Sequence, residues 1–203
     1  FWFDSPLTIR SGSYADELPT EGRVVSRRPS STTTKTLARL HELNKQGYDI
    51  YFCINPLIHQ RRCQKGVLMA RNILVEMDHA DMATQMEMLE RFKSNILSAT
   101  YSGSRSLHMI VKLAPPIWNP NRVGRMMVPG LKKGETSAWW PQYVDLANRW
   151  ISRLEMLGQS IDTKAAKDYA RLSRLPGFLH AGTGVAATLI HLDRYMSWDW
   201  KNE

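Results

Sequence analysis

The middle of the sequence contains a β-hairpin, and this feature limits the folds that the chain can adopt. Residues 98–102 and 107–113 have the character of strands, and the turn Ser-Gly-Ser-Arg separates them. Strands joined this closely run antiparallel, whereas a doubly wound parallel sheet needs a long crossover after each strand. Hydrophobic spacing elsewhere predicts helices over 34–46, 81–96 and 138–157, and strands over 49–54, 72–77 and 187–192. The irregular alternation around a central hairpin favours a mixed α+β domain.

The composition is that of a folded, basic protein. The 203 residues include 27 Lys and Arg against 19 Asp and Glu, so the formal net charge is +8. Such a charge suggests an anionic partner, with nucleic acid or nucleotides as the leading candidates. Two cysteines do not form a secreted disulfide framework, so we expect a reducing, cytoplasmic setting. The sequence has no apolar run of transmembrane length, and we expect no membrane partner.

The sequence predicts two parts of unequal size. Residues 1–33 end in a cluster of Ser, Thr and Arg and are expected to be an irregular N-terminal segment. Residues 34–203 are expected to form a single domain, in which Pro115–Thr136 is mainly loop. The chain begins at Phe1 rather than Met, and we expect it to belong to a longer protein.

Two carboxylates end the apolar segment that starts at Ile73. Glu76 and Asp78 are two residues apart, so on a strand their side chains point to the same face. Carboxylates this close repel each other unless a cation neutralises them, and Mg²⁺ or Mn²⁺ prefers such oxygen ligands. The alternative is a strand end that carries two solvated acids. Asp81, further along, is expected to cap a helix.

Two further segments carry chemistry of the same kind. The turn that contains Ser102, Arg105 and Ser106 can cradle a phosphate, and His108 on the following strand can donate to a triphosphate oxygen. Asp162 can complete a metal site, with a role as a helix N-cap as the alternative. A plain hairpin turn with a packed histidine remains the alternative for the earlier segment, and Asp168 is expected to be structural.

The order of the three segments resembles the archaeo-eukaryotic primase (AEP) superfamily, in its primase-polymerase branch of bacterial, phage and plasmid replication proteins. The likeness rests on Glu-x-Asp, Ser-Gly-x-x-Ser-x-His and an Asp before Arg-Leu-Pro-Gly, and it spans about residues 48–180. The stretch Tyr51–Pro56 is similar to the common Tyr-Phe-x-x-Asn-Pro strand of the family. The resemblance implies a catalytic core with an RRM-like mixed or antiparallel sheet flanked by helices.

The resemblance also implies roles for individual residues. It assigns two Mg²⁺ or Mn²⁺ ions to three catalytic acids and places five other residues at the incoming nucleotide. The acids are Glu76, Asp78 and Asp162, and the nucleotide-binding residues are Ser102, Arg105, Ser106, His108 and Arg174. Arg171, just before the Arg-Leu-Pro-Gly element, is a weaker candidate for a nucleotide or template contact. The first acid is most often Asp in the family, so Glu76 implies a slightly different placement of the metal.

The expected function is that of a DNA primase or primase-polymerase. Such an enzyme uses NTP or dNTP to synthesise primers on a single-stranded DNA template, and a helicase in the same replication system is an expected partner. The alternative is a non-catalytic, nucleic-acid-binding replication initiator module that kept the fold. A metal-dependent nicking enzyme would need a pair of histidines on one strand, but Met109 and Ile110 follow His108.

The two cysteines raise one further question. Cys53, His59 and Cys63 are ligand types for Zn²⁺, but their spacing is irregular and there is no Cys-x2-Cys. We therefore expect buried or free thiols here rather than a structural zinc site.

Overall fold

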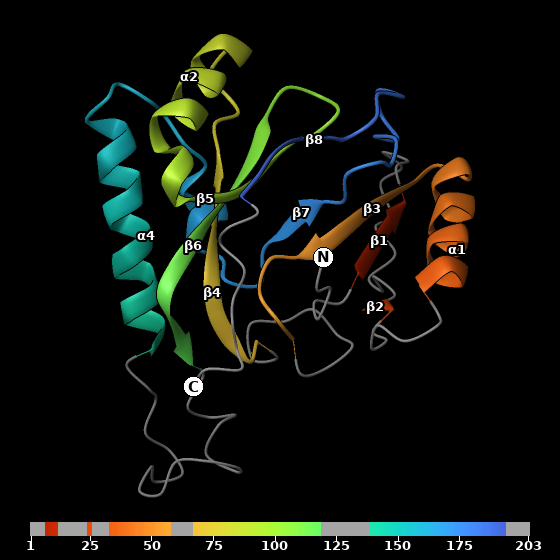
Figure 1. Cartoon of the computed structure of the whole chain (residues 1–203), viewed down its shortest axis with the longest axis horizontal. Helices are drawn as coiled ribbons and strands as arrows, with labels where there is room; N and C mark the ends of the chain where they lie inside the picture. The colour runs from red at the N-terminus through yellow and green to blue at the C-terminus, as the bar shows by residue number, and fades with distance from the viewer. Residues whose placement is uncertain (1–6, 12–23, 26–32, 58–66, 119–138, 194–203) are drawn as a thin grey trace, which may run out of the picture.

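Two four-stranded antiparallel sheets form the centre of the molecule (Figure 1). The computed structural model describes residues 7–11, 24–25, 33–57, 67–118 and 139–193. Within these residues the strand orders are β2-β1-β3-β7 in the first sheet and β4-β6-β5-β8 in the second. The α+β class and the antiparallel arrangement are therefore confirmed.

The second sheet contains the predicted hairpin. β5 and β6 pair antiparallel, with Tyr101 opposite Leu107, and the four-residue turn lies between them. β6 also pairs with β4 on its other side. The strands of this sheet are β4 (Met69–Glu76), β5 (Ile96–Tyr101), β6 (Leu107–Trp118) and β8 (Thr188–Leu192).

The first sheet corrects the expectation of a wholly irregular N-terminal segment. Residues 7–11 form β1, which pairs with β3 over its whole length, and β1 also pairs with β2. The signal in residues 1–33 was weak because these short strands depend on a partner far along the chain. The strands are β1 (Leu7–Ser11), β2 (Val24–Val25), β3 (Tyr48–Cys53) and β7 (Leu172–Arg174).

Three helices lie close to the predicted ranges: α1 (Thr33–Lys45), α2 (Met82–Phe92) and α4 (Trp139–Glu155). The short α5 (Thr163–Lys167) had no predicted range and follows Asp162. The helix expected to reach residue 96 ends early, because a 3₁₀ turn, η2 (Lys93–Asn95), leads directly into β5. The Asp81 carboxylate accepts a hydrogen bond from Thr84 N–H, so the predicted N-cap of α2 is confirmed. None of the described helices is long and apolar enough to cross a membrane.

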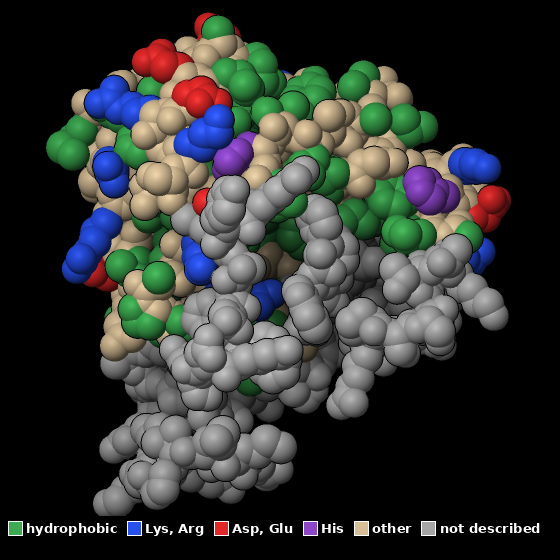
Figure 2. Space-filling model, viewed as in Figure 1, with side chains coloured by type: hydrophobic (Ala, Val, Ile, Leu, Met, Phe, Trp, Pro, Cys, Tyr) green, Lys and Arg blue, Asp and Glu red, His purple; other side chains and the backbone are tan. Residues whose placement is uncertain are grey.

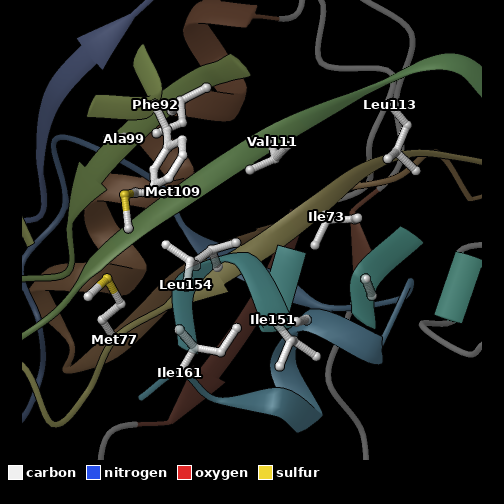
Figure 3. Close-up of a cluster of buried hydrophobic side chains, with 14 of the residues drawn as sticks. Ile73, Met77, Phe92, Ala99, Met109, Val111, Leu113, Ile151, Leu154 and Ile161 are labelled. Atoms are coloured by element: carbon white, nitrogen blue, oxygen red, sulfur yellow. The ribbon is translucent and has the colours of Figure 1, made fainter. Parts of the chain in front are cut away.

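The main hydrophobic core lies between the second sheet, α2 and α4 (Figure 3). Ile73 and Val111 project from the strands, and Phe92, Ile151 and Leu154 meet them from the helices. Full burial of a side chain of this size stabilises the fold by about 1.5–3 kcal/mol. The core thus fixes β4, the strand that ends at the first candidate acid.

The opposite face of β4 packs toward the first sheet. Leu74 forms a small buried cluster with Ile54, which follows β3, and with Ile110 on β6. Since side chains alternate along a strand, Glu76 lies on the same face as Leu74. The end of β4 therefore presents its carboxylate toward the first sheet.

β6 is longer than expected. The segment Pro115–Thr136 was predicted to be mainly loop, but β6 continues through Pro115 and Pro116 to Trp118. The pairing of β4 with β6 shifts register between Ala70 and Asn72, and this irregularity accommodates residues that cannot donate to the ladder. Residues 119–136 lie outside the described part of the chain.

The space-filling view shows how side chains of each kind are distributed over one face. In Figure 2, basic and acidic side chains lie together on the side of α2 and α4, with hydrophobic side chains among them, and further hydrophobic side chains extend over the upper edge. The large hydrophobic residues exposed on the C-terminal strand and the loop before it are Leu179, Val185, Leu189 and Ile190.

Candidate active site

Glu76, the last residue of β4, lies directly opposite His108 on β6. Both side chains are buried, and His108 Nε2 is 3.9 Å from Glu76 Oε1. Two of the three predicted segments are therefore joined by one step of the β-ladder.

The third segment reaches the same place through a backbone hydrogen bond. Asp162 N–H donates to the carbonyl of Glu76 at 2.9 Å, and Ile161 beside it packs into the main core. Asp78 lies just beyond β4, after the buried Met77. Carboxylate oxygens of Glu76, Asp78 and Asp162 all lie within 4.8 Å of one another. The structure thus brings the three predicted acids together.

Asp162 is also the N-cap of α5, which was the alternative reading of this residue. Its Oδ1 accepts hydrogen bonds from Lys164 N–H at 2.9 Å and Ala165 N–H at 3.0 Å. The cap fixes the orientation of the carboxylate through Oδ1 and leaves Oδ2 to accept a hydrogen bond from Arg171. Capping and membership in the acidic cluster are therefore compatible.

Among the described residues, Arg171 is the arginine that pairs with these acids. Its Nη2 donates to Glu76 Oε2 at 3.2 Å and to Asp162 Oδ2 at 3.3 Å. Burial raises the pKa of Glu76, Arg171 opposes this shift, and the charges of Asp78 and Asp162 add to it. Within the described part of the chain one guanidinium pairs with two of the three carboxylates, so the cluster favours a further cation.

The donor set fits a hard divalent ion. Three carboxylates from different segments converge within 4.8 Å, and carboxylate oxygen is the preferred protein ligand of Mg²⁺ and Mn²⁺. Among the described residues this is the only group of three or more potential metal ligands. Glu76, Asp78 and Asp162 are therefore the residues that would hold the metal.

His108 is fixed from the side of β7. Its Nδ1 accepts a hydrogen bond from Arg174 N–H at 3.2 Å and lies 3.2 Å from Ser173 Oγ. Burial, together with the charges of Arg174 and Arg171, lowers the pKa of His108 to about 3. The ring is therefore neutral near pH 7, and because Nδ1 accepts, the proton is on Nε2, which faces Glu76.

Arg174 is held by a buried ion pair. Its two terminal nitrogens donate to the Asp49 carboxylate at 2.7 and 3.1 Å, and its guanidinium lies over the ring of Tyr51. Burial would raise the pKa of Asp49, but hydrogen bonds from Arg174 and from Ala181 N–H lower it below its ordinary value. Arg174 thus positions His108 through its backbone, and a direct contact with nucleotide stays a prediction.

The serine-rich turn immediately precedes His108. Ser102 and Ser106 are buried, and Ser102 N–H donates to the Ser106 carbonyl at 2.9 Å, which closes the turn. Arg105 is exposed at its tip. The turn therefore has a fixed base and an exposed cation, and its contact with nucleotide is a prediction.

Gln85 and Thr183 support this turn, although the sequence reasoning gave them no such role. Buried Gln85 donates to the Arg105 carbonyl at 2.9 Å and accepts from Leu107 N–H at 2.7 Å. Thr183 donates to the Gly103 carbonyl at 2.6 Å. The sequence places Gln85 only within the predicted helix over 81–96. A glutamine on an otherwise apolar helix face is the signal that points to a buried, hydrogen-bonded amide.

Asn55, the first residue of the Asn-Pro element after β3, has a structural role. Its side chain accepts from Arg71 N–H and Asn72 N–H and donates to the carbonyls of Asn72 and Tyr169. All four hydrogen-bonding positions of the amide are used. Asn55 therefore ties β4 to the segment that carries Asp162 and Arg171.

The remaining sequence-based expectations concern Asp168 and zinc. Asp168 accepts a hydrogen bond from Ala170 N–H at 3.0 Å, as expected for a structural acid. Cys53 is buried in β3, whereas His59 and Cys63 lie outside the described residues. The expectation of thiols rather than zinc stays a prediction.

Comparison with known proteins gives a result for the fold alone. No protein-family profile and no curated protein sequence matches the chain. Among solved structures, it is similar to the AEP domain of the primase-polymerase of cyanophage S-2L, with a TM-score of 0.60 and 15% identity, over 93% of this chain and 81% of that one. It is also similar to the polymerase domain of Mycobacterium tuberculosis ligase D in complex with DNA, with a TM-score of 0.52 and 14% identity, over 93% and 74% of the two chains. The chain therefore shares its fold with the AEP domain of a primase-polymerase, and this is the fold that the resemblance in the sequence predicted.

Proposed function

We propose that the chain is the catalytic domain of a DNA primase or primase-polymerase. It transfers nucleotides from NTP or dNTP to a growing primer on single-stranded DNA, with Mg²⁺ or Mn²⁺ as cofactor. The observation that carries the proposal is the convergence of Glu76, Asp78 and Asp162 within 4.8 Å beside His108, on a fold shared with primase-polymerases.

The acids and His108 have complementary roles in this proposal. Glu76, Asp78 and Asp162 hold the metal, which when bound lowers the pKa of the attacking hydroxyl and stabilises charge on the phosphates. Neutral His108 presents its Nε2–H toward the acids, where it can donate to a phosphate oxygen without adding charge. No protein nucleophile is needed for the transfer.

The turn before His108 would bind the rest of the triphosphate. Exposed Arg105 supplies a cation, and Ser102 and Ser106 keep the backbone of the turn in place. Gln85 and Thr183 fix both sides of the turn. The backbone N–H groups of the turn are therefore ordered before the nucleotide binds.

The acidic cluster also bears on the alternative of a non-catalytic binding module. A protein that only binds nucleic acid gains nothing from three carboxylates at its binding face, since they repel phosphate. The cluster therefore favours catalysis. The proposal further includes a helicase of the same phage, plasmid or bacterial replication system as a partner, and the bacterial cytoplasm as the setting.

A primer-synthesis assay tests the proposal. The purified chain is incubated with single-stranded DNA and labelled NTP or dNTP, in parallel with Mg²⁺, with Mn²⁺ and with EDTA. We expect metal-dependent product from the unmodified chain. Asp78→Asn should lower the rate at least about 100-fold, as expected for loss of one electrostatic contact in a transition state.

Asp145→Asn is the matched control, because Asp145 is an exposed acid on α4 that pairs only with Arg149 among the described residues. This variant should retain full synthesis. Nucleotide or DNA binding without any product would favour the non-catalytic module. Full activity of Asp78→Asn would remove Asp78 from the site.

A further inference from the structure

The two arginines near the acids are held in very different ways. Arg174 makes two short hydrogen bonds to a single carboxylate, that of Asp49. Arg171 instead divides one nitrogen, Nη2, between Glu76 at 3.2 Å and Asp162 at 3.3 Å. A bidentate pair is the stronger arrangement, so Arg171 is the more easily displaced of the two.

The backbone of Arg171 is anchored, whereas its side chain reaches the surface. Its N–H donates to the Asp168 carbonyl at 2.9 Å, and its carbonyl accepts from Ile54 N–H at 3.1 Å. The Arg171 side chain is 31% exposed and that of Glu76 only 7%. The guanidinium can therefore rotate toward solvent without disturbing the buried carboxylate or the neighbouring strands.

Arg171 and a divalent ion need the same oxygens. A metal ion held by Glu76 and Asp162 would use the carboxylate oxygens that Arg171 Nη2 now contacts. If Arg171 Nη2 kept its present distances to those oxygens, it would lie close to a doubly charged cation. The repulsion between the two cations disfavours simultaneous contact, and the doubly charged ion offsets more of the carboxylate charge than the guanidinium does.

We propose that Arg171 is a built-in counter-cation that competes with the divalent ion for Glu76 and Asp162 and is displaced when the ion binds. The displaced guanidinium then becomes available to the phosphates of the incoming nucleotide. The inference rests on the proposed function, because it takes these acids as metal ligands. It assigns to Arg171 the positioning of the acids and control over metal affinity, in addition to any contact with substrate.

Direct titration with Mn²⁺ in the absence of nucleotide and DNA tests the inference. Binding is measured by calorimetry for the unmodified chain, for Arg171→Met and for Arg149→Met. Arg171→Met keeps an unbranched, flexible side chain but removes the guanidinium and its charge, so we expect roughly tenfold tighter Mn²⁺ binding, equivalent to about 1.4 kcal/mol. Arg149 lies on α4 and pairs with Asp145, so Arg149→Met removes one positive charge elsewhere and should leave the affinity unchanged.

The outcomes separate this inference from the proposed function. Equal or weaker Mn²⁺ binding by Arg171→Met, with clear binding by the unmodified chain, overturns the inference and leaves the metal site intact. No Mn²⁺ binding by either protein contradicts both the inference and the proposed function. An equal increase in Mn²⁺ affinity for Arg171→Met and Arg149→Met would mean that the affinity responds only to net charge, and this result would also overturn the inference.

Thermal unfolding gives a second readout that does not depend on activity. Arg171→Met leaves the buried Glu76 without its cation, so its melting temperature in EDTA should fall. Mn²⁺ should raise the melting temperature of this variant by more than it raises that of the unmodified chain. If Arg171→Met does not fold, Arg171→Gln is titrated instead, since it also lacks the charge but keeps a hydrogen-bond donor. A Mn²⁺-induced rise no larger than in the unmodified chain would contradict the inference.

Discussion

At the scale of single residues, the protonation state of His108 is set by its surroundings. Arg174 N–H donates to Nδ1, and burial together with two nearby arginines keeps the ring neutral. The sequence placed a histidine beside the candidate acids, but it gave no information on which ring nitrogen carries the proton. That information came from β7, whose three residues are too few to give a periodic signal.

His108 should make the stability of the fold depend on pH. Its pKa is about 3 in the folded chain, well below the ordinary value of 6.5, so the unfolded chain takes up its proton first as the pH falls. The stabilisation is complete above pH 6.5 and is lost between that pH and about 3. From about pH 7 to about pH 5, His108 should account for a loss of about 2 kcal/mol in the free energy of unfolding.

Urea unfolding at a series of pH values, in EDTA, checks this prediction. His108→Gln retains a hydrogen-bond donor but does not titrate in this range, so its stability should fall less steeply with decreasing pH. Parallel slopes for the two proteins would show that His108 titrates as an ordinary histidine.

The residue scale also shows where sequence reasoning reached its limit. The acids could be predicted, because Glu76 and Asp78 follow an apolar strand and Asp162 precedes a recognisable element. The separate roles of Arg171 and Arg174 could not, because each depends on its partner: Glu76 and Asp162 for the first, Asp49 for the second.

At the scale of elements, the turn between β5 and β6 is fixed by crowding as well as by hydrogen bonds. Gly103 has φ +82°, and a Cβ at this position would lie 2.5 Å from the Val185 carbonyl oxygen and 3.0 Å from His180 Cβ. The loop before β8 therefore packs directly against the turn. Only glycine combines this backbone conformation with so close an approach.

Gly103→Ala should therefore disturb both stability and nucleotide binding. The left-handed conformation alone costs about 1–2 kcal/mol for a residue with a Cβ, and overpacking adds about 1–3 kcal/mol. We expect the free energy of unfolding to fall by at least about 2 kcal/mol, and the KM for nucleotide to rise, because the turn must move. Chemical denaturation and steady-state synthesis assays measure the two effects.

Gly184→Ala is the matched control for this substitution. Gly184 also has a positive φ, +70°, but a Cβ there would meet nothing within 4 Å. This variant should carry only the conformational cost and should leave the KM unchanged. Equal destabilisation by the two substitutions would contradict the role of crowding at the turn.

The elements themselves were predictable to different degrees. α1, α2 and α4 have clear hydrophobic periodicity and sit within a few residues of their expected ranges. β1 and β7 gave no usable signal, because short strands are stabilised mainly by the neighbours they pair with. Both pair with β3, which lies far from each of them in the sequence. The pairing holds β7 in place, and β7 contacts His108 through Arg174 N–H.

At the scale of the whole molecule, the net positive charge and the acidic cluster are both compatible with a phosphate-containing partner. The net charge of +8 favours an anionic partner, whereas the three acids on their own would repel one. A metal held by the acids would restore a local attraction for phosphate, and lysines lie in the same segment. Lys164 and Lys167 on α5 follow Asp162, and neither forms an ion pair with any residue that the structure describes.

Binding of single-stranded DNA should therefore weaken with salt, in proportion to the phosphates that the protein neutralises. Each such phosphate contributes a slope of about −0.7 to the logarithm of the affinity against the logarithm of the salt concentration. The double substitution Lys164→Ala/Lys167→Ala should make this slope shallower by up to about 1.4. Fluorescence anisotropy at several salt concentrations measures the slope.

The control Lys93→Ala/Arg149→Ala removes the same charge from residues that already pair with Glu90 and Asp145, and should change the slope little. Equal changes in the two double variants would mean that DNA responds to the net charge, and that α5 is not part of its path.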